Sequence, residues 1–144
     1  MELKNWTDAE AECQRGRGHL ASVTTEYLDK ILSRMADSYG VSQKGVWLGG
    51  RQIMWEWNWS DNSPWGFNNW REGVEHSRYE ACVESFDGRW KDDFCTEEKE
   101  FICQLKVTLA RGTQTVKYKK DKLGFSSFHV WYNYKAASQQ LLDT

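Results

Sequence analysis

The stretch EACVESFDGRWKDDFC, residues 80–95, carries the signals that decide the fold. It holds two of the four cysteines, Cys82 and Cys95, and the strand-like run at residues 83–86. It then reaches Trp90-Lys91-Asp92-Asp93, where a lysine stands among acidic side chains. Several oxygen-bearing side chains in one segment suggest a metal or ligand site. The ammonium group of Lys91 beside them therefore needs an explanation.

The size and charge of the chain exclude several classes of protein. Its 144 residues suffice for one domain with a real core, but not for two. A net charge of -2 and a pI near 5.9 argue against a nucleic-acid partner. No apolar run approaches the roughly 18 to 20 residues of a membrane-spanning helix, and the first residues do not form an apolar secretion signal. We therefore expect one domain with a short appendage, no nucleic-acid partner and no membrane-spanning segment.

The cysteines indicate the compartment. Cys13, Cys82, Cys95 and Cys103 form no Cys-x-x-Cys pair, which disfavours a zinc site. Their even number favours two disulfides over the alternative of four buried thiols. Because disulfides persist in oxidising compartments, we expect an extracellular protein, secreted or a receptor ectodomain, with an incomplete N-terminus.

Two helices are predicted near the N-terminus. Thr7 followed by Glu10 has the form of a capping box and predicts a helix over residues 8–15, which Gly16 ends. A second helix is expected to start after Thr24 or Thr25 and to close at Gly40. Apolar side chains recur along it at spacings of three, four and seven, at Leu28, Ile31, Leu32 and Met35.

Short strands follow the helices. From Val46 onward the apolar runs are brief and are separated by Gly, Asn, Asp and Ser, including the alternation of Trp55, Trp57 and Trp59. Another strand is expected over residues 100–103. Two helices followed by several strands predict an α+β fold with short antiparallel sheets.

Composition changes near residue 104. Residues 1–103 hold 12 Lys/Arg against 19 Asp/Glu, a balance of -7, whereas residues 104–144 hold 7 against 2, a balance of +5. We expect a domain over residues 1–104 and a basic, strand-rich, incomplete extension over 105–144. Its strand-like runs are 115–118 and 125–132, and residues 136–142 favour a helix.

Residues 5–104 resemble a C-type lectin-like domain. The order and spacing of many short motifs carry this resemblance: Trp6, Ala9 and Cys13; Gly18-His19-Leu20-Ala21-Ser22; Trp47-Leu48-Gly49; Trp57-Asn58-Trp59-Ser60-Asp61; Trp70; Glu80-Ala81-Cys82; Trp90-Lys91-Asp92; Cys95; and Phe101-Ile102-Cys103. The resemblance implies that Cys13 pairs with Cys103 and Cys82 with Cys95, one of three possible connectivities. The family's first strand is almost absent here, so the strand at Phe101-Ile102 is expected to leave an uncovered sheet edge.

In this family a long loop flanks the binding surface, and here the loop surface is expected over residues 61–81 together with residues 87–93. The tryptophans of the family framework, Trp47, Trp57, Trp59, Trp70 and Trp90, are expected mainly in the core. Asn62 stands where a turn glycine is common and is suited to a positive φ. The residues expected at the ligand surface are Trp65, Phe67, Asn68, Glu72, Glu75, His76, Glu80, Lys91 and Asp92.

Sugar-binding relatives hold Ca²⁺ with side-chain oxygens at positions that this chain matches only in part. Glu80 and Asp92 are present as weak candidate ligands, but residues 72–76 lack the proline of the family triplet, and Lys91 stands where the family has an asparagine. An ammonium beside a divalent cation costs several kcal/mol at an effective dielectric near 20, and calcium needs about six to eight oxygens. We expect no metal cofactor, with Lys91 paired to Glu80 or Asp92.

Three classes of function compete. The first is a recognition module that binds a carbohydrate or protein ligand through its long-loop surface without calcium. The alternative is a calcium-dependent lectin with a rearranged site built from Glu72, Glu75, Glu80 and Asp92. An enzyme is disfavoured, because His19, His76 and His129 are far apart and no catalytic motif accompanies them.

Overall fold

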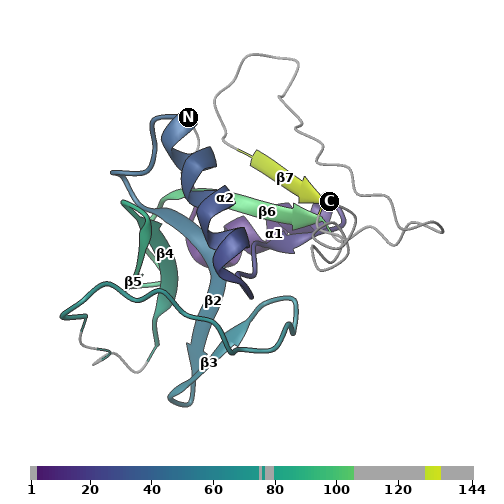
Figure 1. Ribbon diagram of the computed structural model, residues 1–144. Coiled ribbons are helices and arrows are strands. Elements are labelled where there is room, and N and C mark those ends of the chain that lie inside the picture. The colour runs from purple at the N-terminus through teal and green to yellow at the C-terminus, as the bar shows by residue number, and fades with distance from the viewer. Residues whose placement is uncertain (1–2, 75, 77–79, 106–128, 134–144) are drawn as a thin grey trace, which may run out of the picture.

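The computed structural model describes residues 3–74, 76 and 80–105, and the backbone of residues 129–133 (Figure 1). The helices are α1 (Trp6–Arg15) and α2 (Glu26–Ser38), and the strands are β1 (His19–Leu20), β2 (Val46–Ile53), β3 (Glu56–Trp59), β4 (Cys82–Phe86), β5 (Arg89–Asp93), β6 (Glu100–Leu105) and β7 (His129–Asn133). This order confirms the α+β class. Within the described residues, no helix has the length and apolar character needed to cross a membrane.

Helix α1 begins two residues earlier than the sequence predicts. Its N-cap is Asn5, whose side-chain oxygen accepts a hydrogen bond from the amide of Asp8 at 2.9 Å, so the predicted Thr7 cap is wrong. Trp6 explains the difference: its amide donates to the Cys95 carbonyl at 3.0 Å, and its indole Nε1 donates to the Leu48 carbonyl at 2.8 Å. Because Trp6 is anchored on both sides, the first turn starts there.

Helix α2 matches its prediction closely. The side chain of Thr25 accepts a hydrogen bond from the amide of Leu28 at 3.2 Å, which makes Thr25 the N-cap. The helix ends at Ser38, and Gly40 follows at a φ of 70°, a conformation that glycine adopts without steric cost. Its apolar side chains Leu28, Leu32, Met35 and Ala36 are buried.

The described strands form one seven-stranded mixed sheet, not several short antiparallel ones. Its central order is β1-β6-β2-β4-β5, with β3 paired to β2 and β7 paired to β6. Most pairs are antiparallel, but β2 with β6 and β6 with β7 are parallel. Parallel neighbours need a long crossover, and the long-range connection from β2 to β6 provides one.

Alternation along the strands divides the core between two faces of the sheet. The α1 face carries Trp47, Cys82, Phe101 and Cys103, which pack with Trp6, Ala9, Cys13 and Leu20. The opposite face, called the long-loop face, carries Val46, Leu48, Val83 and Ile102, which pack with α2, Trp59 and Trp90. Successive side chains of a strand point to opposite faces, so neighbours such as Trp47 and Leu48 enter different clusters.

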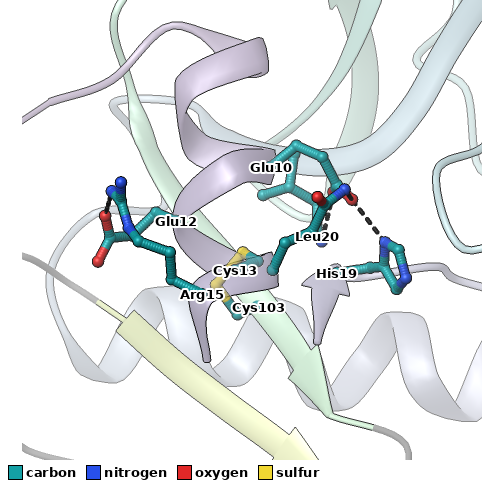
Figure 2. The surroundings of a disulfide bond; sticks show 8 residues. Glu10, Glu12, Cys13, Arg15, His19, Leu20 and Cys103 are labelled. Atoms are coloured by element: carbon teal, nitrogen blue, oxygen red, sulfur yellow. Dashed lines mark hydrogen bonds and ion pairs between the residues drawn. A yellow bond between two sulfur atoms is a disulfide. The ribbon is translucent and has the colours of Figure 1, made fainter. Parts of the chain in front are cut away.

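Both implied disulfides are confirmed. Cys13 on α1 bonds Cys103 on β6, and Cys82 bonds Cys95. Figure 2 shows the first bond together with the Glu10 carboxylate, which ties α1 to β1. Glu10 Oε2 accepts from the Leu20 amide at 2.8 Å, and its Oε1 lies 2.5 Å from His19 Nδ1. His19 is therefore a structural residue of the α1 face.

The expected open edge at β6 is not observed. Strand β7 pairs with β6 from Phe101↔His129 to Leu105↔Asn133 and covers the edge at Phe101 and Ile102 (Figure 1). Residues 129–133 therefore confirm part of the strand-like run predicted at 125–132. The predicted strand at 115–118 and helix at 136–142 lie outside the described residues, and the domain boundary near 104 stays a prediction.

The hairpin that joins β2 to β3 has an unusual turn. Ile53 pairs with Glu56, which leaves Met54 and Trp55 as the two turn residues, with φ angles of 51° and 70°. Two positive φ angles mark a type I′ turn, where Asn and Gly are preferred. The left-handed conformation costs a residue with a side chain about 1–2 kcal/mol. Trp55 thus belongs to a strained turn and not to the predicted strand alternation.

Candidate functional site

A cluster of aromatic side chains lies between the long loop and the sheet. This aromatic cluster consists of Trp57, Trp59, Trp65, Phe67, Trp70 and Trp90. Trp65 stacks on Trp59 with ring centroids 4.5 Å apart, and Trp57 lies 4.8 Å from Trp70. Aromatic pairs at such separations contribute about 0.5–1.5 kcal/mol beyond the area they bury.

Burial separates the members of this cluster. Trp59 and Trp90 are buried, as Trp47 is on the other face, whereas Trp57 and Trp70 are only half-buried. The expectation of core positions for the framework tryptophans is thus met fully by three of them. Trp57 and Trp70 pack against the core and remain partly exposed.

Burial also separates the residues that were predicted to lie in the loop. Trp65 and Phe67 are half-buried and pack against the core, while Asn68 is exposed. Asn62 has a φ of 60°, as its turn position requires. The loop therefore uses its large aromatic residues to attach itself and leaves polar groups at the surface.

A buried carboxylate, missed by the sequence reasoning, holds the loop to α2. Asp29 accepts hydrogen bonds from Trp90 Nε1 and Asn69 Nδ2, both at 2.7 Å. The backbone of Asn69 also accepts from the Trp90 amide at 2.9 Å. Burial raises the pKa of Asp29 above its usual 3.8, although the two hydrogen bonds and nearby Arg89 act in the opposite direction.

His76 and Asp92 meet at the edge of the aromatic cluster. His76 Nδ1 lies 3.6 Å from Asp92 Oδ2, and its ring packs edgewise on Trp70 with centroids 4.3 Å apart. The Asp92 side chain is almost entirely buried, while His76 is half-buried. Of the other predicted acids nearby, Glu72 is exposed in a turn and Glu75 lies outside the described residues.

Glu80 belongs to the other face of the sheet. Its carboxylate forms an ion pair with Arg51, whose guanidinium lies over the Trp6 ring at 5.4 Å. Glu80 also lines a hollow of about 620 Å³ beside the start of α1, together with Asn5, Thr7, Asp8, Phe94, Cys95 and Thr96. Arg51 had not been predicted as a partner, because 29 residues separate the pair in sequence.

Lys91 pairs with Glu84, so its predicted pairing with Glu80 or Asp92 is wrong. Its Nζ lies 3.4 Å from Glu84 Oε1 and 4.0 Å from the centre of the Phe86 ring. The register explains this choice, since Glu84 and Lys91 are directly opposite on β4 and β5. Asp92, one residue further along, points to the long-loop face.

Lys99 completes an ionic cluster on the α1 face. Its Nζ lies 3.0 Å from Glu84 Oε2 and 2.9 Å from Asp93 Oδ2, so the buried Glu84 carboxylate is flanked by two ammonium groups. Burial acts to lower the pKa of Lys99, but its ion pairs with Asp93 and Glu84 outweigh it and hold the pKa above the usual 10.5.

These contacts do not fit a calcium ion. Glu80 and Asp92 face opposite sides of the sheet and each lies beside a cationic or ionisable partner, Arg51 or His76. Across the part of the chain that the structure describes, no group of three or more His, Cys, Asp or Glu side chains could hold a metal. Calcium needs about six to eight converging oxygens, and this arrangement separates them.

Comparison with known proteins identifies the family. A family model described as "Lectin C-type domain" matches residues 2–105. The chain belongs to the C-type lectin domain family. This is a family of lectin-type binding domains, and its typical members are extracellular and disulfide-bonded.

Three proteins illustrate the range of the family. A "C-type lectin galactose-binding isoform" from Pseudechis porphyriacus is 37% identical over 114 residues, covering 72% of each chain. Human lithostathine is 27% identical with a TM-score of 0.62, covering 69% of this chain and 82% of that one. A calcium-independent type II antifreeze protein, 24% identical with a TM-score of 0.58, covers 67% of this chain and 75% of that one and shows the shared fold alone.

Proposed function

We propose that this C-type lectin domain is an extracellular, non-catalytic recognition module that binds a neutral carbohydrate through its long-loop face without calcium. The observation that carries the proposal is the division of the would-be calcium ligands. Glu80 is paired with Arg51 on one face, Asp92 faces His76 on the other, and Lys91 fills the remaining ligand position. Glu80 and Asp92 thus each already have a partner within the protein, an arginine and a histidine.

The aromatic cluster supplies an alternative way to hold a sugar. A pyranose ring has an apolar side of C–H groups that packs on an indole face, and Trp57 and Trp70 keep part of their rings accessible. His76 lies against both rings, and the exposed Asn68 of the same loop adds a second polar side chain for sugar hydroxyls. The galactose-binding name of the Pseudechis relative supports galactose as the first sugar to test.

A glycan array probed with and without EDTA tests both parts of the proposal. The full chain, with its disulfides formed, is expected to bind galactose-containing glycans equally in calcium and in EDTA. A signal abolished by EDTA would instead support the calcium-dependent alternative built from Glu72, Glu75, Glu80 and Asp92. Binding of no glycan in either buffer would leave a protein ligand as the remaining class and would contradict the sugar assignment.

A substitution links the signal to the proposed face. His76→Ala removes a polar ring from the edge of the aromatic cluster and is expected to weaken glycan binding about tenfold, or ~1.4 kcal/mol. Tyr39→Ser, which removes an exposed aromatic ring after α2, serves as the control and is expected to bind like the unmodified protein. Equal binding by both variants would place the sugar elsewhere on the molecule.

A further inference from the structure

The tip of the β2–β3 hairpin exposes three consecutive apolar side chains. Ile53, Met54 and Trp55, called the hairpin tip, are 52%, 76% and 60% exposed. Figure 1 shows this hairpin extending to the bottom of the view, away from β7. Ile53 and Met54 line a hollow together with Trp6, Glu10 and Gln14 of α1. Contiguous exposed apolar side chains often mark sites of interaction with a protein or a membrane.

The backbone of the tip adds a second, independent observation. Met54 and Trp55 both occupy left-handed conformations that favour Asn and Gly, so the chain places bulky apolar residues at the two positions that least accommodate them. Violations of local sequence rules concentrate at functional sites. The strand pairs below the turn, Arg51↔Asn58 and Ile53↔Glu56, hold the tip on a regular support.

We propose that the hairpin tip inserts into the headgroup–acyl interface of a neutral phospholipid membrane. A lipid surface needs no shape complementarity, whereas a stable protein interface takes roughly 800 Å² and 20 to 30 residues from each partner, far more than three side chains offer. Tryptophan favours the membrane interface, and methionine and isoleucine are suited to the acyl region beneath it.

The charges near the hairpin tip favour a neutral membrane over an anionic one. Glu56 is exposed directly beside the tip, and the nearest cation on the same hairpin, Arg51, is already paired with Glu80. Residues 1–103 carry a formal balance of -7, and the +5 balance of residues 104–144 leaves the whole chain at -2. Anionic lipids, which are concentrated on cytoplasmic leaflets, would repel this surface, whereas a neutral outer leaflet would not. The choice of leaflet rests on the proposed extracellular location.

Vesicle pelleting tests the proposal with the full, disulfide-bonded chain. The protein is expected to sediment with sucrose-loaded phosphatidylcholine vesicles and to bind more weakly when phosphatidylserine replaces half of the lipid. The double variant Met54→Asn/Trp55→Gly removes the apolar tip and installs the preferred residues of a type I′ turn, so it is expected to fold at least as stably. It should lose at least about tenfold in vesicle affinity.

The controls separate this proposal from its competitors. Tyr27→Ser removes a side chain of similar exposure (58%) on α2 and should bind vesicles like the unmodified protein. Three results would each overturn the proposal: no sedimentation of the unmodified protein with phosphatidylcholine, equal sedimentation of the tip variant, or binding that requires phosphatidylserine. Tip-dependent self-association without vesicle binding would also overturn it and indicate a protein surface.

Because these vesicles contain no sugar, their outcome is independent of the glycan assignment. The tip variant is expected to retain the full glycan-array signal of the unmodified protein. Failure of glycan binding with intact vesicle binding would refute the proposed sugar site alone, and the reverse result would refute the membrane tip alone.

Discussion

On the α1 face of the sheet, two disulfides and a buried ionic cluster fasten the packing, whereas the long-loop face is held by aromatic contacts and by the hydrogen bonds of one buried carboxylate. The crosslinks and ion pairs of the α1 face therefore oppose its rearrangement. The long-loop face, with no covalent tie between its described residues, depends on how well its rings fit. The difference indicates that the first face contributes most to stability, and it is consistent with the proposed recognition role of the second.

Removing the disulfides one at a time is the strongest test of how the α1 face is stabilised. The Cys13→Ala/Cys103→Ala variant opens a crosslink that spans 90 positions and is expected to lose about 4–5 kcal/mol of unfolding free energy, against ~3 for Cys82→Ala/Cys95→Ala with a span of 13. Urea denaturation of both variants measures the difference. Equal losses would mean that loop closure does not govern the stability of the α1 face.

Replacing Lys99 tests the ionic cluster of the same face. Lys99→Met leaves the buried Glu84 carboxylate with Lys91 as its counter-ion and is expected to cost about 3 kcal/mol. Lys91→Met is the matched control, because its more exposed side chain predicts a loss of about 1 kcal/mol or less. The two losses are compared by urea denaturation, and a Lys91 variant that loses more would reverse the assigned roles.

The raised pKa of Lys99 adds a pH dependence with a definite sign. Its stabilising contribution is fully present below 10.5, the usual value, and is lost as the pH rises through the higher folded-state value. Unfolding curves in alkaline buffer should therefore converge for the unmodified protein and Lys99→Met. Curves that stay parallel across this range would contradict the ion-pair assignment.

Much of the α1 face could be predicted from sequence, because it depends on spacing. Apolar periodicity located α2, Thr25 was one of the two residues after which it was expected to start, and the family motifs implied both disulfides. The start of α1 was missed because Asn5 and Thr7 are both competent caps, and distant contacts of Trp6 decide between them. Such long-range contacts leave no local pattern in the chain.

The long-loop face was predicted less well for a similar reason. Trp65, Phe67 and His76 were expected near the site and do lie around the aromatic cluster. The partner of Lys91 depends on strand register and on the face to which each side chain points, and a shift of one residue exchanges the faces. Asp29 is an acid of the first turn of α2, and no local pattern in the sequence shows that Trp90 and Asn69 approach it.

Asp29 offers a test of the long-loop face through pH. Because its folded pKa is raised, its ionisation disfavours folding: the group's contribution is fully present below 3.8 and is lost as the pH rises through the folded value. The unmodified protein should therefore gain stability relative to Asp29→Asn as the pH falls toward that range. Asp37→Asn, at an exposed acid of the same helix, is the control. A difference curve that is flat, or of opposite slope, would show that Asp29 is not buried as a carboxylate.

The smallest expected effect belongs to the substitution that restores the family asparagine. Lys91→Asn puts back the asparagine that sugar-binding relatives have at this position, yet Glu80 and Asp92 remain on opposite faces and Arg51 remains bound to Glu80. We therefore expect the thermal midpoint of this variant to be the same in calcium and in EDTA, because one additional amide oxygen cannot supply a cage of about six to eight ligands. Adding Arg51→Gln frees Glu80 without turning it toward Asp92. The double variant should therefore also have the same thermal midpoint in calcium and in EDTA. A calcium-dependent rise in the midpoint of the single variant would mean that Lys91 alone excludes the metal. It would also require Glu80 and Asp92 to converge on one ion, which their positions on opposite faces of the sheet do not allow.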